Sequence, residues 1–269
     1  MSFELANNYN NKHLIVQPSD LALSPPESYL YIQDFLIISC GVLYALCYMF
    51  YMTQTYADRV CAGDIRYTAL TMAYELYYAI ATTSTRFERR CFLVWFFMDA
   101  TFATVTIFSV YPSGRRSSVV VPIVIGVPAG LAFLSTLCRH FPDGREQVTA
   151  YWTGILLQLP VGWGSVYLLI QRSDTKGQSL EIWCVMALLL SRSCANLIRI
   201  TRCIGCLTAY GVFVWRYLNV PQNWGYVGSW LSITIIVVTL IPEVIYPAVY
   251  AWACLRESEN TESAKAKLQ

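Results

Sequence analysis

The sequence predicts an all-α, polytopic membrane protein in which seven transmembrane helices form one bundle. Its 269 residues are 56% hydrophobic and only 13% charged, and the mean hydropathy of +0.44 is too high for an ordinary soluble domain. Apolar segments long enough to cross the roughly 30 Å hydrocarbon layer recur along the chain. The net charge of +2 indicates no nucleic-acid partner, so the lipid bilayer is the partner that the composition predicts.

The chain divides into three predicted regions. These are a polar N-terminal tail (1–30), a seven-helix transmembrane domain (31–255) and a charged C-terminal tail (256–269). The first region lacks the basic start and short apolar core of a signal peptide, so we expect the first span to act as an uncleaved anchor. The predicted location is the membrane of the endoplasmic reticulum, with multiple passes.

Seven apolar stretches define the predicted spans. In chain order they cover residues 31–52, 67–84, 91–111, 119–138, 150–171, 181–217 and 226–255. Residues 85–90 leave room only for a tight connection, so the second and third spans should run antiparallel and side by side. The fourth span combines prolines and glycines with no ionisable residue, which predicts a kinked, closely packed scaffold helix.

The fifth and sixth spans carry further irregularities. Pro160 predicts a bend near the middle of the fifth span. The sixth region, at 1.5 Å per residue, is longer than the hydrocarbon layer is thick, so part of it should protrude. Three of its arginines, Arg192, Arg199 and Arg202, share one helical face, where they either snorkel or pair with acids of the bundle, or anchor a substrate.

The second span places a carboxyl group, Glu75, inside the apolar segment LTMAYELYYAIA of residues 70–81. An ionisable group at the middle of a transmembrane helix costs about 2.5 to 3.5 kcal/mol, so it is expected to face the bundle interior. Thr71, Tyr78 and Thr82 lie on the same helical stripe and provide polar neighbours. A functional acid, base or ion ligand is the favoured interpretation, and a glutamate that only hydrogen-bonds a neighbouring helix is the alternative.

Two further carboxyl groups lie deep in predicted spans. Asp99 belongs to the third span, which should pack beside the helix of Glu75, so the two acids can share a cavity. Glu243 belongs to the last span, where Pro247 cannot donate a hydrogen bond to the carbonyl of Glu243 four residues earlier. A bent helix with a freed carbonyl beside an acid is typical of a cavity wall.

The absence of several known motifs reduces the number of reaction types that the sequence can support. The sequence has no paired acidic motif for magnesium, no phosphate-cradling glycine-rich loop with lysine and no Ser-His-Asp set, so we expect no metal and no cofactor. An acid–base site that acts on an apolar substrate fits better, because low-dielectric surroundings favour the protonated form of a carboxyl group. Aromatic rings could then stabilise a carbocation. The aromatic candidates are Tyr74, Tyr78, Trp95, Phe96, Tyr246 and Tyr250.

Four segments carry a resemblance to a known family. They are AYELYYA around Glu75, WFFMD ending at Asp99, LLIQRSDTKGQSLEIW over residues 168–183 and PEVIYP over residues 242–247. In their order and spacing, the sequence resembles the small seven-helix membrane terpene cyclases of fungal meroterpenoid and indole-diterpene pathways, the pyripyropene cyclase family.

This resemblance implies an enzyme of isomerase or lyase type in secondary metabolism. Such an enzyme protonates the terminal epoxide, or an alkene, of a farnesyl or geranylgeranyl chain on an aromatic or polyketide head, and then guides polyene cyclisation. The family's essential acids are a glutamate on the second helix and an acidic residue on the last one, which correspond to Glu75 and Glu243; Glu75, Glu243 or the two together would supply the initiating proton. Glu243 departs from the aspartate that is frequent in the family. Asp99 would orient an acid or hold a helix in place.

Two alternatives remain open at the level of sequence. A seven-helix proton-coupled small-molecule transporter would use the same acids, although no repeat of two three-helix halves is visible. Each aromatic candidate could also serve helix packing alone. A retinal protein is disfavoured, because the last span contains no lysine for a Schiff base.

Overall fold

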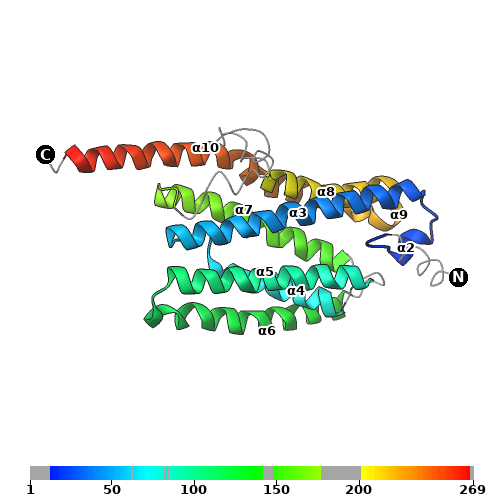
Figure 1. The fold of residues 1–269 in the computed structure, drawn as a ribbon. Coiled ribbons are helices and arrows are strands. Elements are labelled where there is room, and N and C mark those ends of the chain that lie inside the picture. Colours follow the sequence, from blue (N-terminus) through cyan, green and yellow to red (C-terminus); the bar gives the residue numbers. More distant parts are fainter. Residues whose placement is uncertain are drawn as a thin grey trace.

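The computed structural model describes residues 13–61, 63–81, 83, 85–141, 148–176 and 201–266, and their regular structure is entirely helical (Figure 1). The predicted all-α class is confirmed for this part of the chain. The seven longer helices are α3 (Glu27–Asp58), α4 (Thr68–Ala81), α5 (Arg86–Val110), α6 (Ser117–His140), α7 (Val148–Arg172), α8 (Thr201–Asn219) and α10 (Trp230–Ala266). The shorter elements are α2 (Pro18–Leu21), η1 (Ile65–Tyr67), η2 (Ser113–Arg115), α9 (Pro221–Trp224) and η5 (Gly225–Gly228).

Five of these helices are long and apolar enough to cross a membrane, namely α3, α5, α6, α7 and α10. Helix α4 is too short for this criterion, because its 14 residues extend only about 21 Å. Helix α8 corresponds to the second half of the predicted sixth span. The first half of that span and the three arginine side chains lie outside the described residues. The structure therefore supports a multi-pass protein, and the count of seven crossings stays a prediction.

The helices lie roughly along one direction, with α4, α5 and α6 on one side of the bundle and α8 and α10 on the other (Figure 1). Helix α3 packs against α5 and α8, and helix α7 packs against α4 and α10. The described part of the bundle thus brings α3, α4, α5, α7 and α8 around a common interior.

The contact between α4 and α6 is unusually close. A Cβ atom placed on Gly126 would lie 2.9 Å from the Cβ of Ala69, and one placed on Gly130 would lie 2.6 Å from the Cβ of Ala73. Both pairs repeat at a spacing of four residues, so two stripes of small residues allow the backbones to approach. The predicted close packing of the fourth span is confirmed, and it sets the position of the helix that carries Glu75.

The start of α5 corrects one expectation. Residues 86–90 belong to the helix rather than to a connection, because α5 begins at Arg86. The hydroxyl of Thr85 accepts a hydrogen bond from the backbone N–H of Glu88 at 3.1 Å, which is the N-cap arrangement that starts a helix. The capping threonine, rather than the charge of the segment, decides where the helix begins.

The segments near both ends of the described chain have ordered structure. Residues from His13 onward pack against the bundle: buried Asp20 accepts hydrogen bonds from Tyr29 Oη at 2.8 Å and from Trp224 Nε1 at 3.0 Å. Arg216 Nε donates to Gln33 Oε1 at 2.8 Å in the same region. These paired polar groups hold the segment in place where a polar tail was expected. At the other end, α10 continues as a helix to Ala266 and projects beyond its neighbours (Figure 1).

Candidate active site

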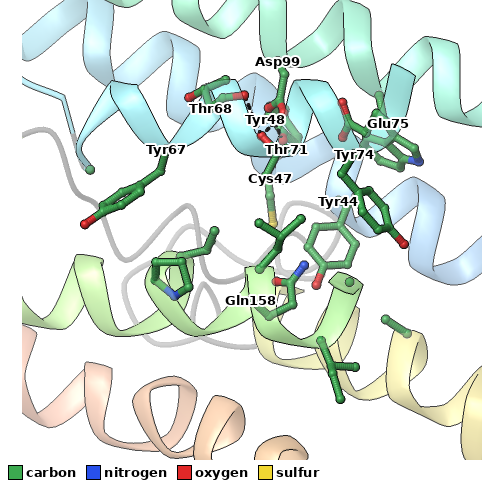
Figure 2. A pocket seen from close by; sticks show the side chains of 18 of the residues that line it. Tyr44, Cys47, Tyr48, Tyr67, Thr68, Thr71, Tyr74, Glu75, Asp99 and Gln158 are labelled. Carbon is green, nitrogen blue, oxygen red and sulfur yellow. Dashed lines mark hydrogen bonds between the residues drawn. The ribbon is translucent and has the colours of Figure 1, made fainter. Parts of the chain in front are cut away.

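A cavity of about 410 Å³ lies inside the bundle, between α3, α4, α5, α7 and α8 (Figure 2). Its volume falls in the range of small-molecule sites. The described lining is rich in aromatic and aliphatic side chains, with a few polar groups that converge on the interior. Two of the three predicted acids, Glu75 and Asp99, line this cavity.

Asp99 is the anchored acid of the pair. Its carboxyl group is only 2% exposed, and its two oxygens accept hydrogen bonds from different helices: Tyr48 Oη on α3 donates to Oδ1, and Thr71 Oγ1 on α4 donates to Oδ2. Two hydroxyl donors satisfy a carboxylate, which has acceptors only. Asp99 therefore connects three helices and is fitted to hold a negative charge at a fixed point.

Glu75 lies one helical turn beyond Thr71 on α4, on the same cavity wall. Its Oε2 atom is buried and has no hydrogen-bond partner among the described residues. A buried carboxyl oxygen without a donor is better accommodated in the neutral acid than in the carboxylate. Within the described part of the site, one cavity thus holds two kinds of carboxyl group. Both oxygens of Asp99 accept hydrogen bonds, whereas Oε2 of Glu75 accepts none from the described residues; we call Asp99 the anchored and Glu75 the unanchored carboxyl.

Aromatic rings surround the two acids. The Trp95 ring centroid lies 5.9 Å from that of Tyr48 and 6.2 Å from that of Tyr44. Tyr74 donates a hydrogen bond from its hydroxyl to the carbonyl of Ala150 at 3.1 Å, which fixes its ring on the wall. The predicted wall residues Tyr74 and Trp95 thus line the cavity.

Sequence reasoning missed the contribution of α3. Tyr44, Tyr48 and Tyr51 all line the cavity from this first span. Their spacing of i, i+4 and i+7 places them on one face of a helix, so the pattern was present in the sequence. Gln158 of α7 also lines the cavity.

The cavity is elongated. Figure 2 shows Tyr67 at one end, the hydrogen bonds of Asp99 in the middle and Glu75 at the other end. The end near Tyr67 lies beside the loop that joins α3 to α4, and the Tyr67 side chain is 45% exposed. The site therefore has a loop end that reaches solvent and a deep end that holds Glu75.

The third predicted acid, Glu243, is not among the described lining residues. It is 3% exposed and lies where α10 packs on α7: a Cβ placed on Gly162 would be 3.7 Å from Glu243 Oε1 and 3.0 Å from Pro242 Cγ. We call the contact of Gly162 with Pro242 and Glu243 the α7–α10 seam. The structure therefore brings Glu75 and Asp99 together but does not place Glu243 on the cavity wall.

Four predicted aromatic residues also lie away from the described lining. Tyr246 is buried between α7 and α10 in a cluster with Val166 and Leu169, and Tyr250 packs against that cluster. Tyr78 is fully buried, with its hydroxyl 3.2 Å from Thr153 Oγ1. Phe96 packs against a cluster of α4, α5 and α6 residues. These four side chains pack between helices, and their role in substrate binding stays a prediction.

The arrangement suits proton transfer to an apolar molecule. It offers an unanchored carboxyl, a fixed carboxyl and aromatic rings within one cavity of small-molecule size. In the described ranges, no three His, Cys, Asp or Glu side chains gather as a metal site requires.

Comparison with known proteins agrees with this site. The family model of Pyr4-like transmembrane terpene cyclases matches residues 19–256. The Pyr4-family terpene cyclase mfmH of Annulohypoxylon moriforme is 29% identical over 253 residues, which are 90% of this chain and 95% of the relative. Terpene cyclase macJ of Penicillium terrestre is 21% identical (84% of this chain, 86% of the relative), and terpene cyclase ausL of Aspergillus calidoustus is 25% identical (92% and 96%). No solved structure matches. The chain belongs to the Pyr4-like transmembrane terpene cyclases.

Proposed function

We propose that this membrane terpene cyclase protonates the terminal epoxide, or an alkene, of a farnesyl or geranylgeranyl chain that carries an aromatic or polyketide head. It then guides polyene cyclisation in fungal secondary metabolism. The observation that carries the proposal is Glu75: an unanchored carboxyl on the wall of an aromatic cavity, in a chain that belongs to a cyclase family.

Glu75 is the proposed proton donor. Its O–H bond breaks as the proton moves to the epoxide oxygen, the C–O bond opens, and the oxygen keeps both electrons as a hydroxyl group. The cation on carbon is then attacked by the next alkene, and each ring closure moves the positive charge along the chain. The last cation loses a proton to water, which restores the neutrality of the product, and Glu75 takes up a proton from solvent before the next turnover. General acid catalysis of this kind contributes about 10²- to 10⁴-fold to a rate.

Asp99 has the complementary role in this proposal. Because Tyr48 and Thr71 donate hydrogen bonds to both of its oxygens, it remains a carboxylate and stabilises positive charge that develops near it. The rings of Tyr48 and Trp95, whose centroids lie 5.9 Å apart, line the same cavity and stabilise the same charge in this proposal.

Glu243 acts in this proposal through the α7–α10 seam, as a positioning residue that holds the wall formed by α7. Its burial against Gly162 and its distance from the described lining support this role. The resemblance noted above makes the last-helix acid essential to the reaction, and a positioning role is compatible with that requirement.

The proposed setting is the endoplasmic reticulum membrane, with residues 31–255 as a seven-helix domain. A proton-coupled transporter would need the same acids, but the membership in a cyclase family supports turnover over transport.

The first test uses membranes that carry the parent protein or the Glu75→Gln variant. Each is incubated with epoxidised farnesyl and geranylgeranyl aromatic substrates, and cyclised products are quantified by mass spectrometry. Turnover should fall by about 10²-fold or more in the variant, because a glutamine cannot donate the initiating proton. Glu259→Gln is the matched control, since Glu259 is exposed and forms only a 3.8 Å ion pair with Arg256. Product that persists in Glu75→Gln would move the donor elsewhere.

A further inference from the structure

One polar group at the loop end of the cavity has no part in the proton chemistry. Asp64 lines the cavity and stands just before η1, where its side chain accepts a hydrogen bond from the backbone N–H of Arg66 at 3.0 Å. Arg66 Nε also lies 2.9 Å from each oxygen of the carboxyl group. These contacts hold the Asp64 side chain in one orientation at the cavity rim.

The same contacts stabilise the negatively charged form of Asp64. The Arg66 guanidinium holds the pKa of the Asp64 carboxyl below its usual range, so the group is a carboxylate at neutral pH. The Asp64 side chain is 33% exposed and that of Arg66 is 64% exposed, which places the pair at the boundary between cavity and solvent. A carboxylate has only acceptors, so its natural ligand is an O–H or N–H group.

Asp64 and Glu75 lie at opposite ends of the cavity. Thr68, which also lines the loop end, is seven residues before Glu75 on α4 and therefore about 10 Å away along the helix axis. Asp64 precedes Thr68 in the chain and lies at the same end. A substrate that lies along this wall with its reacting terminus at Glu75 has its opposite end toward Asp64.

We propose that Asp64 is a specificity-determining residue that accepts a hydrogen bond from an O–H or N–H group on the head of the substrate. This contact orients the molecule with its head at the loop end and its prenyl terminus at Glu75. The inference rests on the proposed function and adds one chemical requirement, which is an O–H or N–H donor on the head of the substrate.

The test uses a matched pair of substrates in membranes. An epoxyfarnesyl resorcinol offers phenolic O–H donors, and its di-O-methyl ether has the same chain without them. The parent protein should prefer the resorcinol in kcat/KM, and Asp64→Asn should reduce this preference by about tenfold, because a neutral acceptor forms a weaker hydrogen bond than a carboxylate. Asparagine keeps the N-cap role, so the loop is preserved.

Asp174→Asn is the matched control variant. Asp174 accepts the backbone N–H of Lys176 at 3.2 Å in the loop after α7, and it is not among the lining residues. That loop lies at the same end of the bundle, since Arg172 Nη1 donates to the carbonyl of Cys61 at 3.0 Å. The control should keep the parental preference. An equal loss of kcat/KM for both substrates in Asp64→Asn would mean that Asp64 only shapes the loop, and would overturn the inference.

A binding measurement separates this inference from the proposed reaction. The saturated analogues hexahydrofarnesyl resorcinol and its dimethyl ether, which have neither an epoxide nor an alkene to protonate, are titrated into the purified full-length protein, and quenching of tryptophan fluorescence gives each Kd. Tighter binding of the resorcinol that disappears in Asp64→Asn supports the inference even if no substrate is turned over. Equal Kd values for the two compounds in the parent protein overturn it, even if Glu75 proves to be the proton donor.

The pH dependence of the preference gives a further check. Because the pKa of Asp64 is lowered, its carboxylate persists from pH 8 down to the usual aspartate range near 4 and is lost only as the pH falls below that range. Besides Arg66, the neighbouring ionisable groups are Cys61 and Tyr111, with Arg172 beside Cys61. The preference for the resorcinol should therefore be constant between pH 6 and pH 8. A preference that disappears within this interval would exclude Asp64 as its source.

Discussion

Glu75 and Glu243 are both glutamates inside the bundle of this cyclase, but their surroundings differ in kind. Glu75 borders a cavity of about 410 Å³, so atoms of a substrate can reach its carboxyl group. Glu243 lies in the α7–α10 seam, where even the Cβ of an alanine at position 162 would approach Pro242 Cγ to 3.0 Å. The comparison teaches that burial alone does not make an acid reactive, because a general acid also needs room for its substrate within hydrogen-bonding reach.

Three sets of variants test the difference between the cavity and the α7–α10 seam. Among them, Asp99→Asn in the cavity is expected to have the largest effect on turnover. Turnover should fall on the order of 10²-fold, because the amide carries no negative charge to stabilise the developing cation. Product formed per amount of folded protein is the measurement, and Tyr48→Phe should show a smaller loss in the same direction, since it removes one of the two donors to Asp99. Asp58→Asn, outside the described cavity lining, is the control. Parental turnover in Asp99→Asn would contradict the assigned role.

On the seam side, Glu243→Gln should lower turnover by about tenfold, less than Glu75→Gln, and should also destabilise the protein. Glu243 is 3% exposed and interacts with its surroundings inside the seam, so exchanging its carboxyl for an amide should cost about 1–3 kcal/mol and lower the midpoint of thermal unfolding. Scanning fluorimetry of the purified protein and product analysis in membranes measure the two effects. A loss of turnover equal to that of Glu75→Gln, with unchanged thermal stability, would show that Glu243 is a reacting acid like Glu75.

The smallest effects are expected for a matched pair of glycines on α7. Gly162→Ala should cost about 1–3 kcal/mol of stability, because its Cβ would crowd Pro242 in the seam. Gly164→Ala should change stability by no more than about 0.5 kcal/mol, since a Cβ there has no heavy atom within 4 Å. Thermal unfolding of the two variants, measured side by side, tests the comparison directly. Equal unfolding midpoints would mean that the seam is not tightly packed.

Most of the fold was accessible from the sequence. The all-α class follows from long apolar stretches, which leave only helices or closed barrels as ways to satisfy the backbone in lipid. The close packing of α6 follows from its glycines, and the pairing of the second and third spans follows from their short connection. The start of α5 was misplaced by a few residues, because the charges of residues 86–90 outweighed the capping role of Thr85 in the prediction.

The candidate site was accessible only in part. Glu75 and Asp99 are identifiable because carboxyl groups in apolar helices are rare and costly, and the adjacency of their helices predicts a shared cavity. The tyrosines of α3 were missed, although their spacing marks one face, because aromatic residues are common in transmembrane helices and most of them serve packing. Asp64 carries no sequence signal at all, since an aspartate before a short turn is ordinary loop chemistry.

The sequence by itself determined which groups are chemically able to act: a helical membrane chain, three deep carboxyls and many aromatic rings. Only the tertiary structure decided which of them meet, because spacing along one helix defines a face but not the neighbour that the face contacts. Helix packing turns Glu75, Asp99 and the tyrosines of α3 toward one cavity and presses Glu243 against Gly162. The physical reason is that the space left between helices depends on side-chain volumes contributed by several segments at once, and no single segment encodes it.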